Sequence, residues 1–139
     1  MSTIKAANVQ NTGSGAPTFK NSSGTEIGQL AKAWVNFDGG RGGSVSIRDS
    51  FNVSSITDNA VGAYTVNFTN AMANTNYATM CSQGDGSTHG SIPYLTYLSV
   101  GGYAQSVSIT TGSVKVYSTI YNRSSDYDAN YNFVAIFGD

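Results

Sequence analysis

The side chains that could do covalent or acid–base chemistry in this chain are few and stand far apart. Its 139 residues include one histidine, His89, and one cysteine, Cys81. A nucleophilic residue needs a basic partner within hydrogen-bond reach, and His89 is the only histidine that could supply one. Zinc needs a cluster of His and Cys ligands, which one of each does not make. We therefore expect no nucleophilic or metal site, and interpret Cys81 as a buried structural thiol.

Paired carboxylates are the remaining catalytic candidates. Glycoside hydrolysis could use Asp126 with Asp128, or Asp49 with Asp85. The nearer pair lies in the segment SSDYD, which is typical of a solvated turn. The sequence contains no nucleophile elbow and no phosphate-cradling loop. We therefore expect a protein that is not an enzyme and that uses no cofactor.

Binding chemistry is better represented, because the chain has nine tyrosines. Tyrosine gives flat apolar area and a hydroxyl at low entropic cost, which suits binding surfaces. Most of these rings are explained by covering sheet faces. Four residues fall on predicted loops and form the candidate receptor-binding set: Asp85, His89, Tyr103 and Tyr127. The loop DGSTH could hydrogen-bond sugar hydroxyls beside an aromatic ring.

Composition excludes several partners. Only 11% of residues are charged and the net charge is −1, against about a quarter in average proteins. The seven cations are scattered singly, so we expect no nucleic-acid binding. No apolar run approaches the roughly 18 residues of a membrane helix, so we expect no membrane insertion. The first residues, MSTIKAANVQ, lack the apolar core of a signal peptide, which predicts synthesis in a cytoplasm.

The alternation of apolar residues predicts an all-β protein. In the segment AKAWVNF, Ala33, Val35 and Phe37 share one side, whereas Trp34 lies on the other. This period of two is that of a strand, and Trp34 indicates that both faces are partly covered. The last strand, YNFVAIF, is apolar on both sides, so it should be central in its sheet or covered by a subunit interface. Strands separated by Gly-Gly, Thr-Gly and Ser-Ser-Asp predict an antiparallel, knob-like β-sandwich of about 8–10 strands over residues 31–139.

Three local predictions test this interpretation. The segment SVSIRDSFNV is expected to place Val45, Ile47, Asp49, Phe51 and Val53 on one face, with a bend near Arg48–Ser50. The segment SSITDNAVG is expected to form the next turn, with Asp58 and Asn59 as turn residues. The segment NFTNAMANT could hold one short helical turn at most.

Residues 1–30 differ from the rest of the chain. They are polar and rich in Gly and Ser, and TGSGAP and NSSGTE are typical of turns or loops. Such a segment cannot bury enough apolar surface to order itself. We expect an extended N-terminal arm that lies against a partner, with short strands near Ile4–Gln10 and Thr18–Asn21.

Several segments resemble small structural modules of bacteriophage virions. These are AKAWVNFDG, SFNVSSITDN, YTVNFTNAMANTNYATM and the closing YNFVAIFGD. They are similar to the terminal (knob) domains of tail-fibre proteins, particularly of phages that infect cyanobacteria. The opening, IKAANVQNTGSGAPTFKNSSGTEIGQL, is similar to leaders found before such domains. The resemblance covers most of residues 1–80 and the last strand, and residues 83–131 match no pattern.

The resemblance implies a homotrimer located in the virion and assembled in the host cytoplasm. It implies contacts with other virion proteins of the tail or capsid, and with a host surface glycan. The expected function is a non-enzymatic tail-fibre or appendage tip. A capsid decoration (cement) protein, whose N-terminal arm clamps neighbouring virion subunits, is the alternative. A free-standing carbohydrate-binding module is a third hypothesis.

Overall fold

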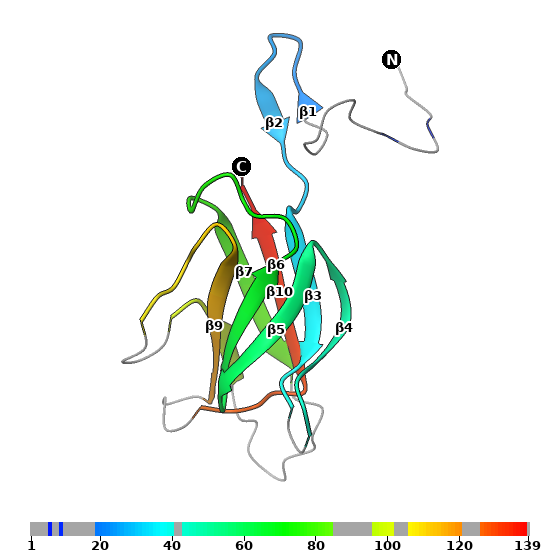
Figure 1. Ribbon diagram of the computed structural model, residues 1–139. Helices are drawn as coiled ribbons and strands as arrows, with labels where there is room; N and C mark the ends of the chain where they lie inside the picture. Colours follow the sequence, from blue (N-terminus) through cyan, green and yellow to red (C-terminus); the bar gives the residue numbers. More distant parts are fainter. Residues whose placement is uncertain are drawn as a thin grey trace. The chain divides into compact units, whose positions relative to one another are not determined.

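In the computed structural model, the residues that the structure describes form ten strands (Figure 1). The structure describes residues 6, 9, 19–40, 43–84, 96–101, 106–120 and 126–138. The strands are β1 (Phe19–Lys20), β2 (Glu26–Gly28), β3 (Ala33–Asp38), β4 (Ser46–Phe51), β5 (Val53–Ala60), β6 (Ala63–Phe68), β7 (Ala78–Gly84), β8 (Thr96–Ser99), β9 (Ser113–Ile120) and β10 (Tyr131–Phe137). The chain divides into two compact units, Met1–Leu30 and Ala31–Asp139.

The first unit contains a small hairpin of β1 and β2. Its turn is held by Asn21, whose Oδ1 accepts hydrogen bonds from the backbone N–H groups of Ser23 and Thr25 at 3.1 and 2.9 Å. Gly24 takes a positive φ of 81°, which glycine adopts without strain. The strand predicted over Thr18–Asn21 overlaps β1, but the strand β2 was not predicted. The strand expected over Ile4–Gln10 lies outside the described residues, apart from residues 6 and 9.

The second unit is an antiparallel β-sandwich, as the sequence predicted. One sheet has the strand order β4-β3-β10-β7 and the other has the order β5-β6-β9-β8. All pairings are antiparallel, and the described residues contain no helix. The last strand, β10, lies between β3 and β7, so its predicted central position is confirmed.

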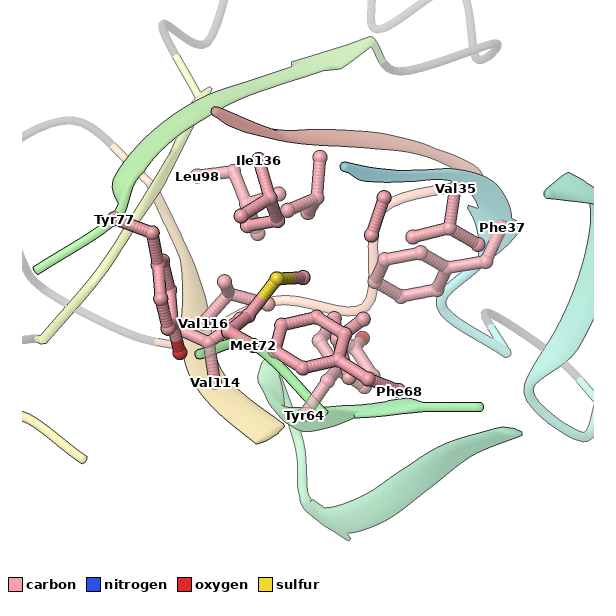
Figure 2. Packing of buried hydrophobic residues seen from close by; sticks show 13 residues of the cluster. Val35, Phe37, Tyr64, Phe68, Met72, Tyr77, Leu98, Val114, Val116 and Ile136 are labelled. Carbon is pink, nitrogen blue, oxygen red and sulfur yellow. The ribbon is translucent and has the colours of Figure 1, made fainter. Parts of the chain in front are cut away.

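The inner faces of the two sheets enclose one hydrophobic core (Figure 2). The ring of Phe37 packs edge-on against Tyr64 with 5.2 Å between centroids, and Phe68 packs against Tyr77 at 5.8 Å. The buried cluster consists of Ala33, Val35, Phe37, Tyr64, Val66, Phe68, Met72, Tyr77, Leu98, Val114, Val116, Val134 and Ile136. Because these residues alternate along each strand, every second residue of the same strands points away from the core.

The prediction of one common face from Val45 to Val53 was wrong. Arg48 is an extra residue between the pairs Asn36↔Asp49 and Phe37↔Ile47, so the side chains before and after it point to opposite sides. The bend expected near Arg48–Ser50 is this bulge. A second break follows at Asn52, which takes a φ of 55° and separates β4 from β5. Val53 therefore begins a strand of the other sheet.

The predicted turn at Asp58 and Asn59 was also wrong. Both residues lie within β5, where Asp58 pairs with Tyr64 of β6. The turn follows at Val61 and Gly62, and Gly62 has a φ of 67°. The sequence signal was ambiguous because Asp and Asn also occur on solvated edge strands, and β5 is an edge strand.

Candidate functional site

The outer face of the sheet β4-β3-β10-β7 is the most unusual surface among the described residues. Residues that pair directly across neighbouring strands point to the same side. Phe51 pairs with Trp34, Trp34 with Ala135, and Ala135 with Met80. These four residues therefore form one row across all four strands, on the side away from the core. We call the outer surface of these strands the aromatic face.

The aromatic face leaves large apolar side chains in solvent. The exposed fractions are 36% for Trp34, 54% for Phe51, 65% for Met80, 41% for Tyr131 and 40% for Phe133. Single exposed apolar residues are normal, but a contiguous group of them marks an interaction surface. These residues come from four adjacent strands and are contiguous by their pairing.

A groove of about 530 Å³ runs along this face. Its floor is at Ala135, the smallest side chain of the row, and Trp34 and Met80 stand on either side of it. Phe133 and Phe137, two residues before and after Ala135 on β10, lie at its ends. Asn36 also lines the groove, but its Oδ1 is buried and has no hydrogen-bond partner within the described residues. The groove is therefore mainly an apolar surface.

The outer side of β5 and β6, in the other sheet, is polar. Asn67 Nδ2 donates hydrogen bonds to Ser55 Oγ and Thr57 Oγ1 at 3.0 and 2.9 Å. Asn59 Nδ2 donates to Thr65 Oγ1 at 2.9 Å. These short polar side chains satisfy one another and suit contact with water. The polar outer side chains of β5 and β6 thus contrast with the apolar side chains of the aromatic face.

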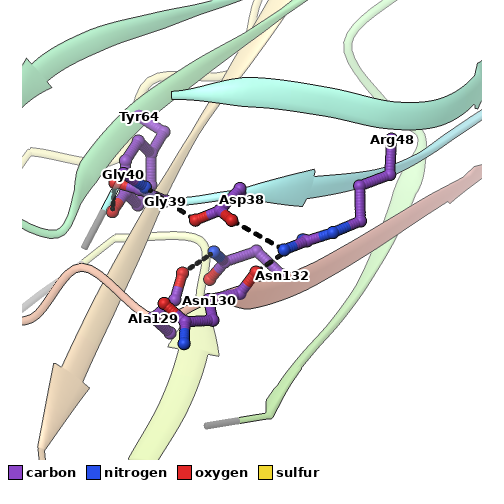
Figure 3. A network of polar contacts seen from close by, with 8 residues as sticks. All are labelled: Asp38, Gly39, Gly40, Arg48, Tyr64, Ala129, Asn130 and Asn132. Atoms are coloured by element: carbon purple, nitrogen blue, oxygen red, sulfur yellow. Dashed lines mark hydrogen bonds and ion pairs between the residues drawn. The ribbon is translucent and has the colours of Figure 1, made fainter. Parts of the chain in front are cut away.

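An ion pair stands at the edge of the aromatic face (Figure 3). The guanidinium of Arg48, the bulge residue of β4, lies 2.7 Å from Asp38 Oδ2 and also donates to the backbone carbonyl of Asn130. Its Cζ stands 4.4 Å from the centre of the Tyr131 ring, a cation–π contact. Arg48 and Asp38 neutralise each other, so this edge carries no net charge from the pair.

A buried hydroxyl fixes one end of the sandwich. The Tyr64 hydroxyl is 2.7 Å from Asp128 Oδ1 and 3.0 Å from the carbonyl oxygen of Gly39, and the N–H of Gly62 also donates to Asp128 Oδ1 at 2.7 Å. Burial, and then the hydrogen bond to Asp128, raise the pKa of Tyr64 well above its usual value. The expectation of a solvated turn was wrong for Asp128, because its carboxylate is a structural acceptor.

Glycine is required where this end of the sandwich closes. A Cβ on Gly39 would lie 2.5 Å from the Tyr64 hydroxyl oxygen and 2.6 Å from the carbonyl oxygen of Ala129. Figure 3 shows Gly39 beside Tyr64, with Asn132 and Ala129 next to it. Asn132 is fully buried and its Nδ2 donates to the Ala129 carbonyl at 2.8 Å. These contacts are structural and leave no space for a ligand at Gly39.

The predicted receptor-binding set is only partly placed. Asp85, His89 and Tyr103 lie outside the described residues. Tyr127 is half-buried, and its backbone N–H donates to the carbonyl of Ser118 at 3.1 Å. The aromatic face was not among the predicted sites. Its signals were Trp34 opposite the core residues of β3 and the continuous apolar sequence of β10.

The remaining chemical candidates give no reactive centre in the described ranges. Cys81 points toward the core, and burial raises the pKa of its thiol to about 11, which keeps it protonated at neutral pH. No group of three or more His, Cys, Asp or Glu side chains is arranged to hold a metal ion in the part of the chain that the structure describes. Nor do those residues include a helix long and apolar enough to span a bilayer.

Comparison with known proteins gives no family assignment. No family model, no curated protein and no solved structure matches the chain.

Proposed function

We propose that this chain is a non-enzymatic structural protein of a bacteriophage particle, in which three copies form a tail-fibre or appendage tip that contacts the host surface. The observation that carries the proposal is the aromatic face. A chain with 11% charged residues and a hydroxyl- and amide-rich surface elsewhere on the sandwich exposes Trp34, Met80 and Phe133 together. Such a face is suited to a subunit interface. In a structural protein made of several copies, this face would form the contact between subunits.

The assignment to a phage particle is supported by the short segments that resemble tail-fibre tip domains. Three of them, AKAWVNFDG, SFNVSSITDN and YTVNFTNAM, supply β3, the last two residues of β4, and most of β5 and β6. The resembling sequence therefore lies in the sandwich framework. Receptor choice in this proposal belongs to Asp85, His89, Tyr103 and Tyr127, which the sequence predicts to lie in loops, because loops on a rigid scaffold commonly carry binding specificity.

A capsid decoration protein is the second candidate, and the first unit favours it. The hairpin residues Phe19 and Ile27 and the following Leu30 are exposed by 47%, 68% and 47%. A two-stranded hairpin has too little core to be stable alone. Apolar side chains on such a hairpin suit docking onto another protein, as an arm that clamps neighbouring virion subunits would do.

Particles purified from the phage that carries this gene provide the test. Quantitative mass spectrometry should find the chain in a few to a few dozen copies if it forms appendage tips, and in hundreds if it decorates the capsid. Its absence from particles would refute both proposals. Substituting Asp85, His89 and Tyr103 by alanine should then reduce adsorption of an appendage-tip phage to its host. Unchanged adsorption would remove these residues from the receptor site.

A further inference from the structure

We infer that a water molecule is bound inside the sandwich, between the side-chain amides of Asn132 on β10 and Gln83 on β7. The two residues pair directly across these neighbouring strands, so their Cβ atoms lie about 5 Å apart. The site is near the buried hydroxyl of Tyr64, because a Cβ on Gly39 would lie 2.5 Å from that hydroxyl and 3.0 Å from Asn132 Nδ2. This hydration site belongs to a single copy of the sandwich and goes beyond the proposed function.

Both amides point into the sandwich. Asn132 is fully buried, and Val134 and Ile136, two and four residues later on β10, belong to the core. Gln83 stands two residues after Cys81, which packs against the same core. Since side chains alternate along a strand, Gln83 and Asn132 share the inner side of the sheet with these residues. The two amides therefore lie between the sheets and not on the surface.

Three polar atoms of this pair have no hydrogen-bond partner within the described residues. They are Asn132 Oδ1, Gln83 Oε1 and Gln83 Nε2, and all three are buried. A buried donor or acceptor left without a partner destabilises the fold, and the large majority of buried side-chain polar atoms in native proteins have one. Three such atoms on two directly paired residues therefore indicate a ligand that hydrogen-bonds to them.

The orientation of the Asn132 amide is fixed by its other contact (Figure 3). Nδ2 donates to the carbonyl oxygen of Ala129 at 2.8 Å, and because only the nitrogen of an amide can donate, this bond assigns the positions of Nδ2 and Oδ1. Nδ2 faces Ala129 and Gly39, and Gly39 directly follows β3. Oδ1 is turned away from them, and β7 with Gln83 borders β10 on the side opposite to β3.

A water molecule matches the hydrogen-bonding capacity of the three atoms. Its two hydrogens can be donated to Asn132 Oδ1 and Gln83 Oε1, and its oxygen can accept a hydrogen from Gln83 Nε2. A buried water typically makes about three such bonds. A cation would meet the amide hydrogens of Nε2, and an anion would meet the two carbonyl oxygens, so a charged ligand is a poorer match. A direct bond from Nε2 to Oδ1 would leave Oε1 without a partner.

A crystal structure of the full chain, at a resolution that shows ordered water, tests the inference directly. It should show one water oxygen at hydrogen-bond distance, about 2.5–3.2 Å, from Asn132 Oδ1, Gln83 Oε1 and Gln83 Nε2. In the variant Gln83→Met, whose side chain has a similar length but no amide, this water should be absent. Density for a direct bond between the two amides, or for another group of the chain in that position, would overturn the inference.

The sign of a stability change tests the same point in solution. If water bridges the amides, Gln83→Met removes two of its three partners and leaves Asn132 Oδ1 unpaired, so the urea midpoint should fall by about 0.5 M or more. If Gln83 is simply unpaired, the same variant removes two unpaired polar atoms, and the midpoint should rise. An unchanged or higher midpoint would therefore contradict the bridge. Circular dichroism verifies that the variant is folded.

Thr79→Val is the matched control on the same strand. The Thr79 hydroxyl is also buried and without a partner in the described part of the chain, but Thr79 pairs with Ile136, a hydrocarbon side chain. No paired polar group is there to share a water, so this variant should leave the urea midpoint unchanged or raise it. Equal losses in the two variants would assign the effect to the packing of β7 and would count against the water.

Discussion

The hydroxyl of Tyr64 offers a prediction with a clear magnitude. Tyr64→Phe keeps the buried ring and its edge-on contact with Phe37, but removes the hydroxyl 2.7 Å from Asp128 Oδ1. A hydrogen bond to a charged acceptor contributes about 1.5–3 kcal/mol. We expect a loss of about 2 kcal/mol at pH 7, which corresponds to a lower urea midpoint by roughly 1 M. Equilibrium unfolding followed by circular dichroism measures it.

The same variant should behave differently at alkaline pH. Because burial and Asp128 raise the pKa of Tyr64, the folded protein keeps this proton when the unfolded chain has lost it. The stabilisation is fully present below about pH 10 and falls as pH rises above that value, by about 1.4 kcal/mol per pH unit. Phenylalanine cannot ionise, so the deficit of Tyr64→Phe should shrink to less than about 1 kcal/mol at pH 11.

Tyr131→Phe provides the control for this prediction. Tyr131 is exposed on the aromatic face, and its contact with Arg48 uses the ring, which phenylalanine retains. This variant should change stability by less than about 0.5 kcal/mol at either pH. A Tyr64→Phe deficit that stays constant from pH 7 to pH 11 would show that the hydroxyl is not held protonated, and the account of this end of the sandwich would be wrong.

Four further outcomes are expected. Phe68→Ala should destabilise the sandwich by roughly 3–5 kcal/mol in urea unfolding, and a loss under about 1 kcal/mol would contradict its place in the core. Gly39→Ala should lower the free energy of unfolding by about 2 kcal/mol or more, since the added Cβ meets the hydroxyl of Tyr64. Wild-type stability would show that small shifts of the neighbouring atoms remove this clash. The Cys81 thiol has a pKa of about 11 in the folded protein, so its protonated form stabilises the fold below about pH 9. This stabilisation should be lost as pH rises from about 9 to 11. In Cys81→Ala, the free energy of unfolding should therefore fall less over this pH range. Deleting residues 1–30 should leave a folded sandwich with an unchanged circular dichroism spectrum above 190 nm, and loss of the β signal would show that the two units fold together.

The sandwich was predictable because its strands repeat a simple alternation. Ala33, Val35 and Phe37 of β3 have the period of two, and one inner face follows from it directly. The central position of β10 followed from its apolar residues on both sides. These are local patterns, and each is read within one strand.

The errors fell where a single residue changes the register. Nothing in the letters SIRDSF marks Arg48 as a bulge, because the bulge is fixed by pairing with β3. Asn52 breaks the chain between two sheets by taking a left-handed φ, and its side chain holds the carbonyls of Lys32 and Asn70. Both features depend on residues distant in sequence, so a local pattern cannot reveal them.

The sequence predicted the aromatic face only in part. Trp34 opposite the core side of β3 indicated a covered second face, but the row from Phe51 to Met80 appears only when four strands are placed in order. Ala135 gives no signal by itself. Its small side chain matters because Trp34 and Met80 stand on either side of it.

The strand order β4-β3-β10-β7 has a consequence for synthesis on the ribosome. The first strand of the sandwich, β3, pairs with the last, β10, and the N–H of Lys32 donates to the carbonyl of Ile136 at 2.8 Å. In a nascent chain, β3 therefore lacks its β10 partner until about a hundred further residues have been translated. A product that stops before Tyr131 lacks the strand that joins β3 to β7, and its sheet stays split. Incomplete translation products should thus be exposed to proteolysis.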